Sequence, residues 1–548
     1  MRSGTKYLLG LLVLTVLSAP PIRAQTKAPA SLDAAQPIPG ALVIHGGGTL
    51  PDDVIKHFLQ LAGGQKAKLI VIPTASASAD KNHDALKTTW QKRGFGSVTI
   101  LHTHSRKTAD SDDFIKPLTQ ATAVWFGGGL QSRLAKAYVG TAVERQLHAL
   151  LKRGGVIGGT SAGAAIMSRV MIRGGKLKPE IGKGLGLIPN AIIDQHFTQR
   201  KRQGRLIDAV AQHPGLVGYG IDERTSLVVR GRGIYVLGES KVSVYLGKSK
   251  NRPLRLITLS KNSRADLVAL SRAAIERTKP AYPPAKPPLP IVKKGTLIIV
   301  GGGTTGPMLK RFIKAAGGPD QPIVIVPTAI GSRAQAYAIN MTRTFKGAGA
   351  TNVSIVHATL DQKQTHPQLL KTLAKAKGVW FTGGRQWRLV DSYLDTKVEK
   401  AFHDVLARGG VIGGSSAGAT IQGDYLVRGN PLGNREMMSE GYERGFAFLP
   451  GVTVDQHFTQ RNRFKDLELF KKTFPQIIAL GIDEFTAVVV SGHTMEVIGR
   501  HKVAVYDRPK SIDDKTAVTQ YTKLKVGDRY DFKTRSKLPM VTEPASGK

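Results

Sequence analysis

The sequence contains no cysteine, which excludes disulfide bonds, thiolate metal sites and a cysteine nucleophile. Acidic residues are also scarce, with 39 aspartates and glutamates against 79 lysines and arginines, so the formal net charge is +40. Such a charge suggests a nucleic acid or an anionic surface as partner. The basic residues are spread along the chain, however, and zinc-finger, RRM-type and basic-zipper patterns are missing. We therefore expect no nucleic-acid partner.

An apolar run long enough for a confident membrane span is missing from the N-terminus. Arg2 and Lys6 precede a short apolar segment, residues 7–18, and Ile22-Arg23-Ala24 is suited to cleavage. This pattern predicts a signal peptide over residues 1–24, with a retained anchor as the alternative; a lipoprotein is excluded because no cysteine follows. We expect a periplasmic or extracellular protein that begins near Gln25 and has no stable membrane insertion.

The string DQHFTQR occurs twice, at residues 194–200 and 455–461. Other strings repeat in the same order, among them GG-x-SAGA and GIDE, with an offset of about 255 that becomes 261 at DQHF. The chain is therefore a tandem duplication of a whole domain. The proline-rich residues 279–293 suit a stiff linker between predicted domains over residues 38–278 and 294–548.

Within each copy, short β-branched runs alternate with amphipathic stretches such as residues 52–61 and 308–316. Strands that alternate with helices predict an α/β fold, a mainly parallel sheet flanked by helices on both faces. In such sheets the chemistry lies at the carboxyl ends of the strands.

An apolar run leads into the G-x-S-x-G motif of residues 159–163, and small residues suited to a helix follow it. This is the pattern of a nucleophile elbow, in which glycines allow the sharp turn that lifts Ser161 above the sheet. Ser416 has the same place in the second copy. Small-residue turns also serve close strand–helix packing, but two preserved copies favour a nucleophile.

A serine nucleophile needs a base, and three histidine pairs match between the copies: His102 with His357, His148 with His403, and His196 with His457. We favour His196 and His457, because they lie inside seven identical residues. His102 and His357 end apolar runs and are rivals, whereas the His148 pair lies on predicted helices. The remaining candidates drop out because other residue types face them in the other copy: His45, His57 and His104 face Val300, Phe312 and Thr359.

The base needs a carboxylate to orient it. Glu223 and Glu484 each follow their histidine by 27 residues, but Asp222 and Asp483 are rivals that spacing alone does not separate. Arginines that can hold a substrate carboxylate follow the same string: Arg200 and Arg202 in the first copy, and Arg461 and Arg463 in the second.

These motifs together resemble the cyanophycinases of the S51 serine peptidases, relatives of peptidase E, and the resemblance covers nearly all of the mature chain. It implies two tandem flavodoxin-like, class I glutamine-amidotransferase-like domains. It also implies a Ser-His-Glu triad in each, at Ser161, His196 and Glu223, and at Ser416, His457 and Glu484. The implied activity releases β-Asp-Arg dipeptides from cyanophycin, without metal or cofactor.

The resemblance further implies which residues surround each triad. The oxyanion hole falls on Gly128 or Gly129 with Ala162, and on Gly383 or Gly384 with Ala417. The implied substrate-binding residues are Gln131, Asp194, Gln195, Arg200, Arg202 and Arg205 in the first copy, and Gln386, Asp455, Gln456, Arg461 and Arg463 in the second.

The sequence departs from the family pattern in three places. Leu130 and Arg385 replace an aspartate that often follows the paired glycines, and the first copy is shorter after its elbow. Asp466 in the second copy occupies the place of Arg205 in the first. This last difference predicts that the first domain favours substrates with a free carboxylate more strongly.

The leading hypothesis is a secreted serine exopeptidase acting on cyanophycin or a related peptide or polymer. One alternative is a peptidase E-like dipeptidase acting on Asp-containing peptides. Another is a non-catalytic protein that binds an anionic polymer. The oligomeric state stays open, and two repeated domains in one chain allow a dimer-like pairing.

Overall fold

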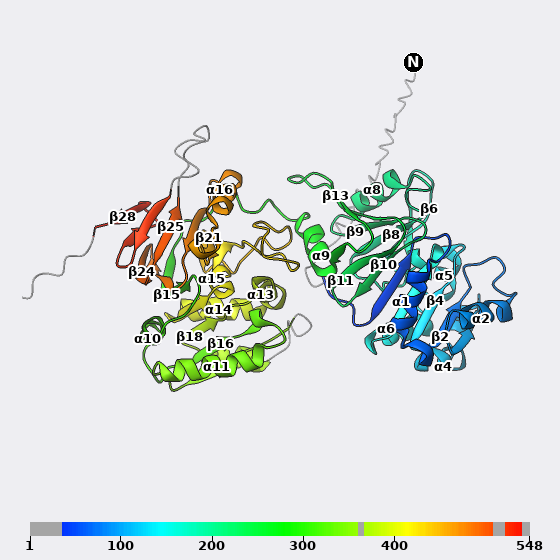
Figure 1. Cartoon of the computed structure of the whole chain (residues 1–548), viewed down its shortest axis with the longest axis horizontal. Coiled ribbons are helices and arrows are strands. Elements are labelled where there is room, and N and C mark those ends of the chain that lie inside the picture. The colour runs from blue at the N-terminus through cyan, green and yellow to red at the C-terminus, as the bar shows by residue number, and fades with distance from the viewer. Residues whose placement is uncertain (1–34, 360–366, 508–520, 540–548) are drawn as a thin grey trace, which may run out of the picture.

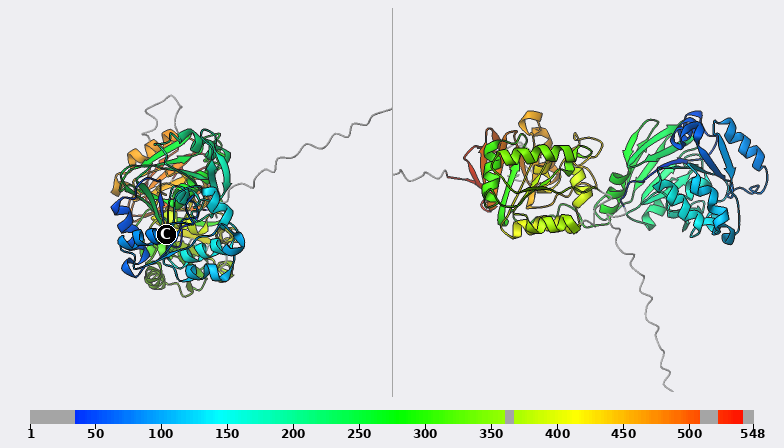
Figure 2. Two further views of the ribbon diagram at one scale, coloured as in Figure 1. Left: turned by 90° about the vertical axis from the view of Figure 1, so that its right-hand side faces the viewer. Right: turned by 90° about the horizontal axis from the view of Figure 1, so that it is seen from below.

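The computed structural model describes residues 35–359, 367–507 and 521–539. The predicted signal peptide, residues 1–24, lies outside this part of the chain. Two lobes of mixed helix and strand lie side by side (Figure 1), as the view from below also shows (Figure 2, right). Across the described residues, none of the helices combines the length and apolar character that a membrane crossing requires.

The main sheet of the first domain has the strand order β14-β11-β10-β1-β5-β4-β2-β3. From β1 to β3 the neighbours are parallel, and β10, β11 and β14 continue the sheet antiparallel. The bounds are β1 (Ala41–His45), β2 (Lys68–Ile72), β3 (Ser97–Ile100), β4 (Ala123–Phe126), β5 (Val156–Thr160), β10 (Thr225–Arg230), β11 (Gly233–Gly238) and β14 (Arg264–Asp266).

Helices cover both faces of this sheet because its strands are apolar on both sides. On one face Phe58 of α1 packs against Trp90 of α2 and Trp125 of β4, and on the other Leu118 of α4 and Leu147 of α6 join the core. The helices are α1 (Asp52–Ala62), α2 (His83–Lys92), α3 (Arg106–Ala109), α4 (Asp112–Gln120), α5 (Gln131–Tyr138), α6 (Ala142–Lys152), α7 (Ala162–Ala165), α8 (Gln203–Gln212) and α9 (Leu267–Glu276). A 3-10 turn, η2, spans Gly64–Lys66.

A second sheet, which the sequence did not predict, has the order β13-β12-β9-β8. Its β8 and β9 are parallel, and a separate hairpin of β6 and β7 precedes it. The string DQHFTQR begins at the end of β8, so the predicted base arises from the smaller sheet. The bounds are β6 (Val170–Gly174), β7 (Glu180–Lys183), β8 (Ala191–Gln195), β9 (Val217–Ile221), β12 (Val242–Leu246) and β13 (Arg255–Leu259).

The second domain repeats both sheets, with the orders β17-β16-β18-β19-β15-β23-β24-β27-β28 and β20-β21-β22-β25-β26. Its strands are β15 (Val292–Val300), β16 (Ile323–Val326), β17 (Val353–Ile355), β18 (Gly378–Phe381), β19 (Val411–Ser415), β20 (Gly423–Tyr425), β21 (Leu449–Gln456), β22 (Ile478–Ile482), β23 (Thr486–Gly492), β24 (Thr494–Gly499), β25 (Lys502–Tyr506), β26 (Thr522–Lys525), β27 (Arg529–Asp531) and β28 (Ser536–Leu538). Its helices are α10 (Gly306–Ala315), η3 (Thr328–Ile330), α11 (Ala334–Gly347), α12 (Pro367–Lys375), α13 (Gln386–Tyr393), α14 (Lys397–Ala407), α15 (Ala417–Thr420), η5 (Thr459–Arg461) and α16 (Phe464–Thr473).

The prediction of two tandem α/β domains is confirmed, and the helices expected over residues 52–61 and 308–316 are α1 and α10. The expectation of one mainly parallel sheet per domain is incomplete. Each domain adds antiparallel strands to the main sheet and builds a second, smaller one. Exact domain boundaries stay predictions.

Arginines of the first domain meet carboxylates of the second where the lobes touch. Glu440 accepts from Arg277 at 2.6 Å, from Arg252 at 3.0 Å and from Arg255 at 2.9 Å. Arg232 donates to Asp391 at 2.9 Å.

Candidate active site

Ser161 and Ser416 lie on sharp turns between a strand and a short helix. Ser161 follows β5 and has a φ of 52°, and Ser416 follows β19 with a φ of 57°. Left-handed backbone is strained for a serine and is typical of nucleophile elbows. Gly163 permits the turn, because a Cβ there would lie 2.4 Å from the carbonyl oxygen of Phe126. The strand–turn–helix context expected from G-x-S-x-G is therefore present twice.

The histidines of the two DQHFTQR strings also have left-handed backbone, with a φ of 49° at His196 and 51° at His457. The N–H of His196 donates to the carbonyl of Gly46, while the N–H of Ser161 donates to that of His45. The loop after β1 thus links the nucleophile of the main sheet to the histidine of the second sheet. Glycine is needed at position 47, because a Cβ there would lie 2.2 Å from Cε1 of His196.

Each histidine bridges a serine and a glutamate. In the first domain, Nε2 of His196 lies 2.7 Å from Ser161 Oγ, and Nδ1 lies 2.5 Å from Glu223 Oε1. The second domain repeats the arrangement: Nε2 of His457 lies 2.8 Å from Ser416 Oγ, and its Nδ1 lies 2.6 Å from Glu484 Oε1. This is the geometry of a nucleophile, a base and an orienting carboxylate.

The rival carboxylates have a different task. Asp222 accepts from the backbone N–H of Thr198 at 3.0 Å and from Ser240 Oγ at 2.7 Å. Asp483 likewise accepts from the N–H of Thr459 at 3.0 Å. Both aspartates therefore hold the chain just after the histidine, and the contact with the imidazole belongs to the glutamates.

The remaining positions of the repeated string now have physical roles in the first domain. The ring of Phe197 packs against Gly220 so closely that a Cβ on that glycine would lie 2.5 Å away. Oε1 of Gln199 accepts from the N–H of Glu223 at 3.0 Å and so fixes the glutamate's backbone. Gln460 does the same for Glu484. The role of Gln199 was missed in the sequence, although its repetition was the available signal.

The surroundings of the bridging histidines lower their pKa values and so favour the neutral imidazole. Burial lowers the pKa of His196, and Arg200 lowers it further, against the opposing effect of Glu223. Burial also lowers the pKa of His457, with Arg461 acting in the same direction and Glu484 against it. A neutral imidazole is the form that can accept a proton from serine.

The glycine pairs before α5 and α13 divide into two roles. Gly128 and Gly383 lie beside the serines, since a Cβ on them would be 3.6 Å and 3.4 Å from the serine Cβ. Gly129 instead lies against the carbonyl oxygen of Ala75, which would be 2.1 Å from a Cβ at this position, and its φ is 135°. Of the predicted oxyanion residues, Gly128 and Gly383 are therefore the ones nearest the nucleophile, with Ala162 and Ala417 directly after it in the chain.

Arginines of the first domain form a buried network with Asp194, whose side chain is fully enclosed. Arg205 donates from Nε to Asp194 Oδ2 at 2.9 Å, and also from Nη2 to Oδ1. Arg202 donates to the carbonyl of Gln195 at 2.7 Å. Arg200 alone of the three arginines is exposed. The roles of Asp194, Gln195 and these arginines in substrate binding stay predictions.

The second domain builds the same network with a different arginine. Arg428, in the segment after β20, donates from Nε and Nη2 to the two oxygens of Asp455, both at 2.9 Å, and pairs with Asp466 at 2.6 Å. Arg463 donates to Asp455 at 2.7 Å and to Gln456 Oε1 at 2.9 Å. Asp466 is thus not an uncompensated charge. The expected contrast with Arg205, and the carboxylate preference built on it, loses its basis.

The other predicted residues are bonded to neighbouring parts of the fold. Gln131 Nε2 donates to the carbonyl of Ile172 at 2.9 Å, and Gln386 Nε2 to that of Val427 at 2.8 Å. The rival base His102 contacts Thr74 Oγ1 at 2.8 Å and Asp80 at 3.0 Å. Its counterpart His357 contacts Thr328 at 2.9 Å. Neither rival histidine contacts a nucleophile. His148, which lies on α6, contacts the carbonyl oxygen of Leu185 through its Nε2 at 2.9 Å.

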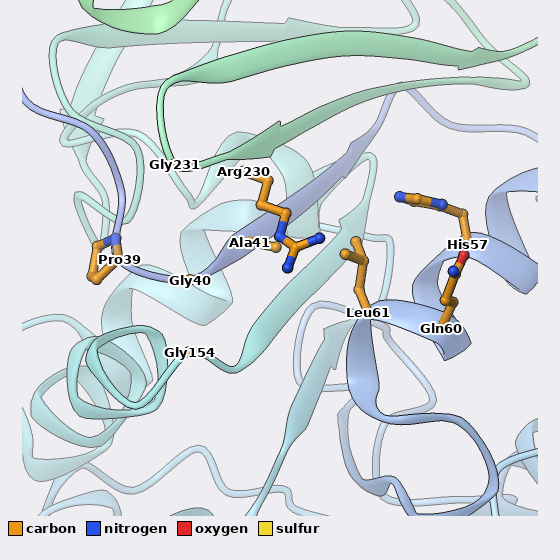
Figure 3. Close-up of a pocket in the computed structure, with 9 residues that line it drawn as sticks. All are labelled: Pro39, Gly40, Ala41, His57, Gln60, Leu61, Gly154, Arg230 and Gly231. Carbon is orange, nitrogen blue, oxygen red and sulfur yellow. The ribbon is translucent and has the colours of Figure 1, made fainter. Parts of the chain in front are cut away.

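A cavity of about 470 Å³ lies beside the first nucleophile and is lined by Gly128, Thr160, Trp90, Trp125 and Arg93, among others. A larger cavity, of about 700 Å³, lies at the opposite end of the parallel strands. Figure 3 shows it between the start of β1 at Ala41, α1 and the side chain of Arg230. Chemistry in open α/β sheets belongs to the carboxyl ends of strands, and the smaller cavity lies at that end, next to Gly128 and Thr160.

Comparison with known families gives two matches in this chain. The model of Peptidase family S51 matches residues 42–237 and again residues 297–498. The cyanophycinase of Geminocystis herdmanii is 32% identical over 206 residues, 36% of this chain and 76% of the relative. The cyanophycinase of Synechococcus elongatus is 34% identical over 200 residues, 35% of this chain and 62% of the relative. That of Trichormus variabilis is 35% identical over 201 residues, 35% of this chain and 67% of the relative.

Two solved structures are also similar. A peptidase from an acI-B1 Actinobacterium is 24% identical, with a TM-score of 0.33, and the match covers 42% of this chain and 98% of that one. A putative peptidase E protein from Listeria monocytogenes EGD-e is 14% identical, with a TM-score of 0.31, and the match covers 38% of this chain and 98% of that one.

Proposed function

Because the chain belongs to peptidase family S51, and the family's model matches both halves, we propose that it is a serine peptidase with two active sites that releases β-Asp-Arg dipeptides from cyanophycin or a related peptide. The observation that carries the proposal is the bridge from serine through histidine to glutamate, repeated in both domains at 2.5–2.8 Å. The cyanophycinase relatives support the substrate class.

The proposed reaction runs through an acyl-enzyme. Ser161 Oγ passes its proton to His196 Nε2 and attacks the carbonyl carbon of the scissile amide, while Glu223 stabilises the imidazolium. The oxyanion is stabilised by the N–H of Ala162 and that of Gly128 or Gly129. The imidazolium then gives the proton to the leaving amine, and the C–N bond breaks. Water, activated by the same histidine, cleaves the ester and restores the serine.

The second domain follows the same steps with Ser416, His457 and Glu484. Arg200 and Arg461 are exposed close to the histidines, so we propose that they attract the substrate's carboxylates. We also propose that the protein is exported, since a basic start followed by a short apolar segment is typical of signal peptides.

Two substrates distinguish the alternatives. The purified mature protein is incubated with cyanophycin and, separately, with Asp-X dipeptides, and the products are identified by mass spectrometry. Release of β-Asp-Arg dipeptides supports the proposal, and cleavage of Asp-X alone supports a peptidase E-like dipeptidase. The matched control is the double variant Ser161→Ala with Ser416→Ala, for which we expect a loss on the order of 10⁶ in kcat. Wild-type turnover by this folded variant would refute serine catalysis, and binding without turnover by the native chain would favour the binding-protein alternative.

A further inference from the structure

A histidine and aspartate cluster lies apart from the triad, on the main sheet of the first domain. It consists of Asp80 in the loop before α2, with His102 and His104 directly after β3. One possible ligand atom from each residue lies within 4.8 Å of the others. Nε2 of His102 is 3.0 Å from Asp80 Oδ1, and Nε2 of His104 is 3.8 Å from Oδ2.

These separations suit a single small cation. A tetrahedral ion with bonds of about 2.1 Å to nitrogen and oxygen separates its ligand atoms by roughly 3.4 Å. The separations to Asp80 lie on either side of that value. Asp80 and His104 are largely exposed, at 71% and 54%, and can adjust, whereas His102 is only 5% exposed and stays fixed.

The fixed histidine has the support that metal-binding histidines need. Its Nδ1 contacts Thr74 Oγ1 at 2.8 Å, and that hydroxyl is bonded in turn to Tyr138 at 2.6 Å. Such a second layer of hydrogen bonds sets the ring orientation and leaves Nε2 free to act as the ligand.

The second domain shows which part of the arrangement belongs to the fold and which part is added. His357 contacts Thr328 at 2.9 Å, and Thr328 contacts Tyr393 at 2.7 Å, as in the first domain. Thr359, however, stands at the position of His104. The hydroxyl support is therefore common to both copies, and the second imidazole is particular to the first.

We propose that Asp80, His102 and His104 form a binding site for a divalent transition-metal ion of the Zn²⁺ type, which water would complete. Imidazole and carboxylate ligands suit such ions. His83 is not counted, because its Nε2 is bonded to the carbonyl of Ala79 at 2.7 Å. The site differs from the proposed peptidase centre and needs none of its residues.

A bound ion would connect the loop that carries Asp80 to the end of β3. The same loop reaches the nucleophile, because the carbonyl of Ala75 accepts from the N–H of Leu130, two residues after Gly128. The ion would therefore stabilise the first domain close to its proposed oxyanion loop, and the second domain would lack this dependence.

The test uses tag-free full-length mature protein, since a histidine tag binds the same ions. After treatment with a chelator and its removal, calorimetric titration with ZnCl₂ is expected to show one site per chain. His104→Thr, which copies the second domain, and Asp80→Asn should each weaken that site at least about tenfold. His501→Thr removes an exposed histidine elsewhere and should leave the affinity unchanged. Circular dichroism checks the fold of each variant.

Titration with CoCl₂ gives a second readout, since ligand-field bands of bound Co²⁺ depend on the ligands. The expected result is a band that native protein and His501→Thr share and that the two cluster variants lose. Absence of a stoichiometric site in the native chain overturns the proposal. Retention of native affinity by either cluster variant overturns it as well. Hydrolytic activity is not needed for either readout, so a failure here leaves the peptidase proposal untouched.

Discussion

Arg428 holds Asp455 in the second domain as Arg205 holds Asp194 in the first, each through Nε and Nη2 of the guanidinium. The two arginines come from different places in the repeat, one from the helix after DQHFTQR and the other from the segment before it. Since a buried carboxylate without a cation is costly, the second domain can carry an aspartate at the position of Arg205 because Arg428 and Arg463 supply the charge that Asp455 needs.

The first prediction follows from this exchange. Arg205→Ala and Arg428→Ala should each lower the free energy of unfolding of their own domain by about 1.5–3 kcal/mol, since each removes a charged two-bond contact from a buried aspartate that then keeps only Arg202 or Arg463 as a partner. Arg173→Ala removes an exposed ion pair with Glu180 and should cost less than about 1 kcal/mol. Urea unfolding followed by tryptophan fluorescence measures the loss. Near-native stability of both variants would show that the arginines do not support the aspartates.

The sequence predicted the nucleophile turns and the repeated histidines because the G-x-S-x-G and DQHFTQR strings recur in both copies, although 35 residues separate Ser161 from His196 and 41 separate Ser416 from His457. It could not predict the second sheet, whose short strands carry no periodicity that separates them from the main sheet. Arg428 was also not singled out, because its partner Asp455 is 27 residues away and the matching arginine of the first copy, Arg173, pairs with the exposed Glu180 instead. Spacing could not decide whether Glu223 or Asp222 orients the histidine, since adjacent residues differ in the direction of their side chains and the sequence does not give that direction.

The second prediction separates those two carboxylates. In a Ser416→Ala background, which isolates the first site, Glu223→Gln should lower kcat by about 10³–10⁴-fold, because an amide does not stabilise the imidazolium. Asp222→Asn should do less, since its partners are the Thr198 N–H and the Ser240 hydroxyl: the amide oxygen can still accept from the N–H, and the amide NH2 can donate to the hydroxyl, which also accepts. Steady-state kinetics on cyanophycin measures both. A larger loss in Asp222→Asn would transfer the orienting role to the aspartate.

The third prediction concerns pH. His196 must be neutral to act as a base, so kcat/KM should fall as pH drops through its pKa, which burial and Arg200 hold below the ordinary value of 6.5. Arg200→Ala removes a nearby cation and makes the imidazolium easier to form. The acid limb of the profile should therefore move to higher pH in the Ser416→Ala background.

The pH at which the acid limb falls distinguishes two effects of Arg200→Ala, a change in the pKa of His196 and the loss of a substrate contact. Loss of a substrate contact at Arg200 would lower kcat/KM at every pH without moving the limb. Lys201→Ala is the matched control, as it removes the exposed cation next in the chain, and its profile should keep the native midpoint. A midpoint that stays put in Arg200→Ala, or moves to lower pH, would contradict the assignment of His196 as the base.

The last prediction concerns the contact between the domains. Glu440 is only 11% exposed and pairs with Arg252, Arg255 and Arg277 of the first domain. Burial acts to raise its pKa, but the ion pairs with Arg277 and Arg252 lower it on balance. Because the pKa of this carboxyl is lower in the folded protein, its ionised form stabilises the contact fully at any pH above the pKa of the unfolded state. This contribution is lost as the pH falls through the pKa of the folded state.

Glu440→Gln should imitate that acid state at neutral pH, because the neutral amide leaves the buried guanidinium of Arg277 without its charge partner. The contact should weaken by about 3 kcal/mol, and small-angle X-ray scattering should then report a larger radius of gyration as the domains separate. Glu239→Gln, which breaks an exposed pair with Arg224 inside the first domain, should leave the radius unchanged. The radius of gyration of the native chain should increase in the same way when the buffer is acidified. An equal radius for native protein and Glu440→Gln at pH 7 would contradict the prediction. It would mean that the pair of Asp391 and Arg232 holds the domains together without Glu440.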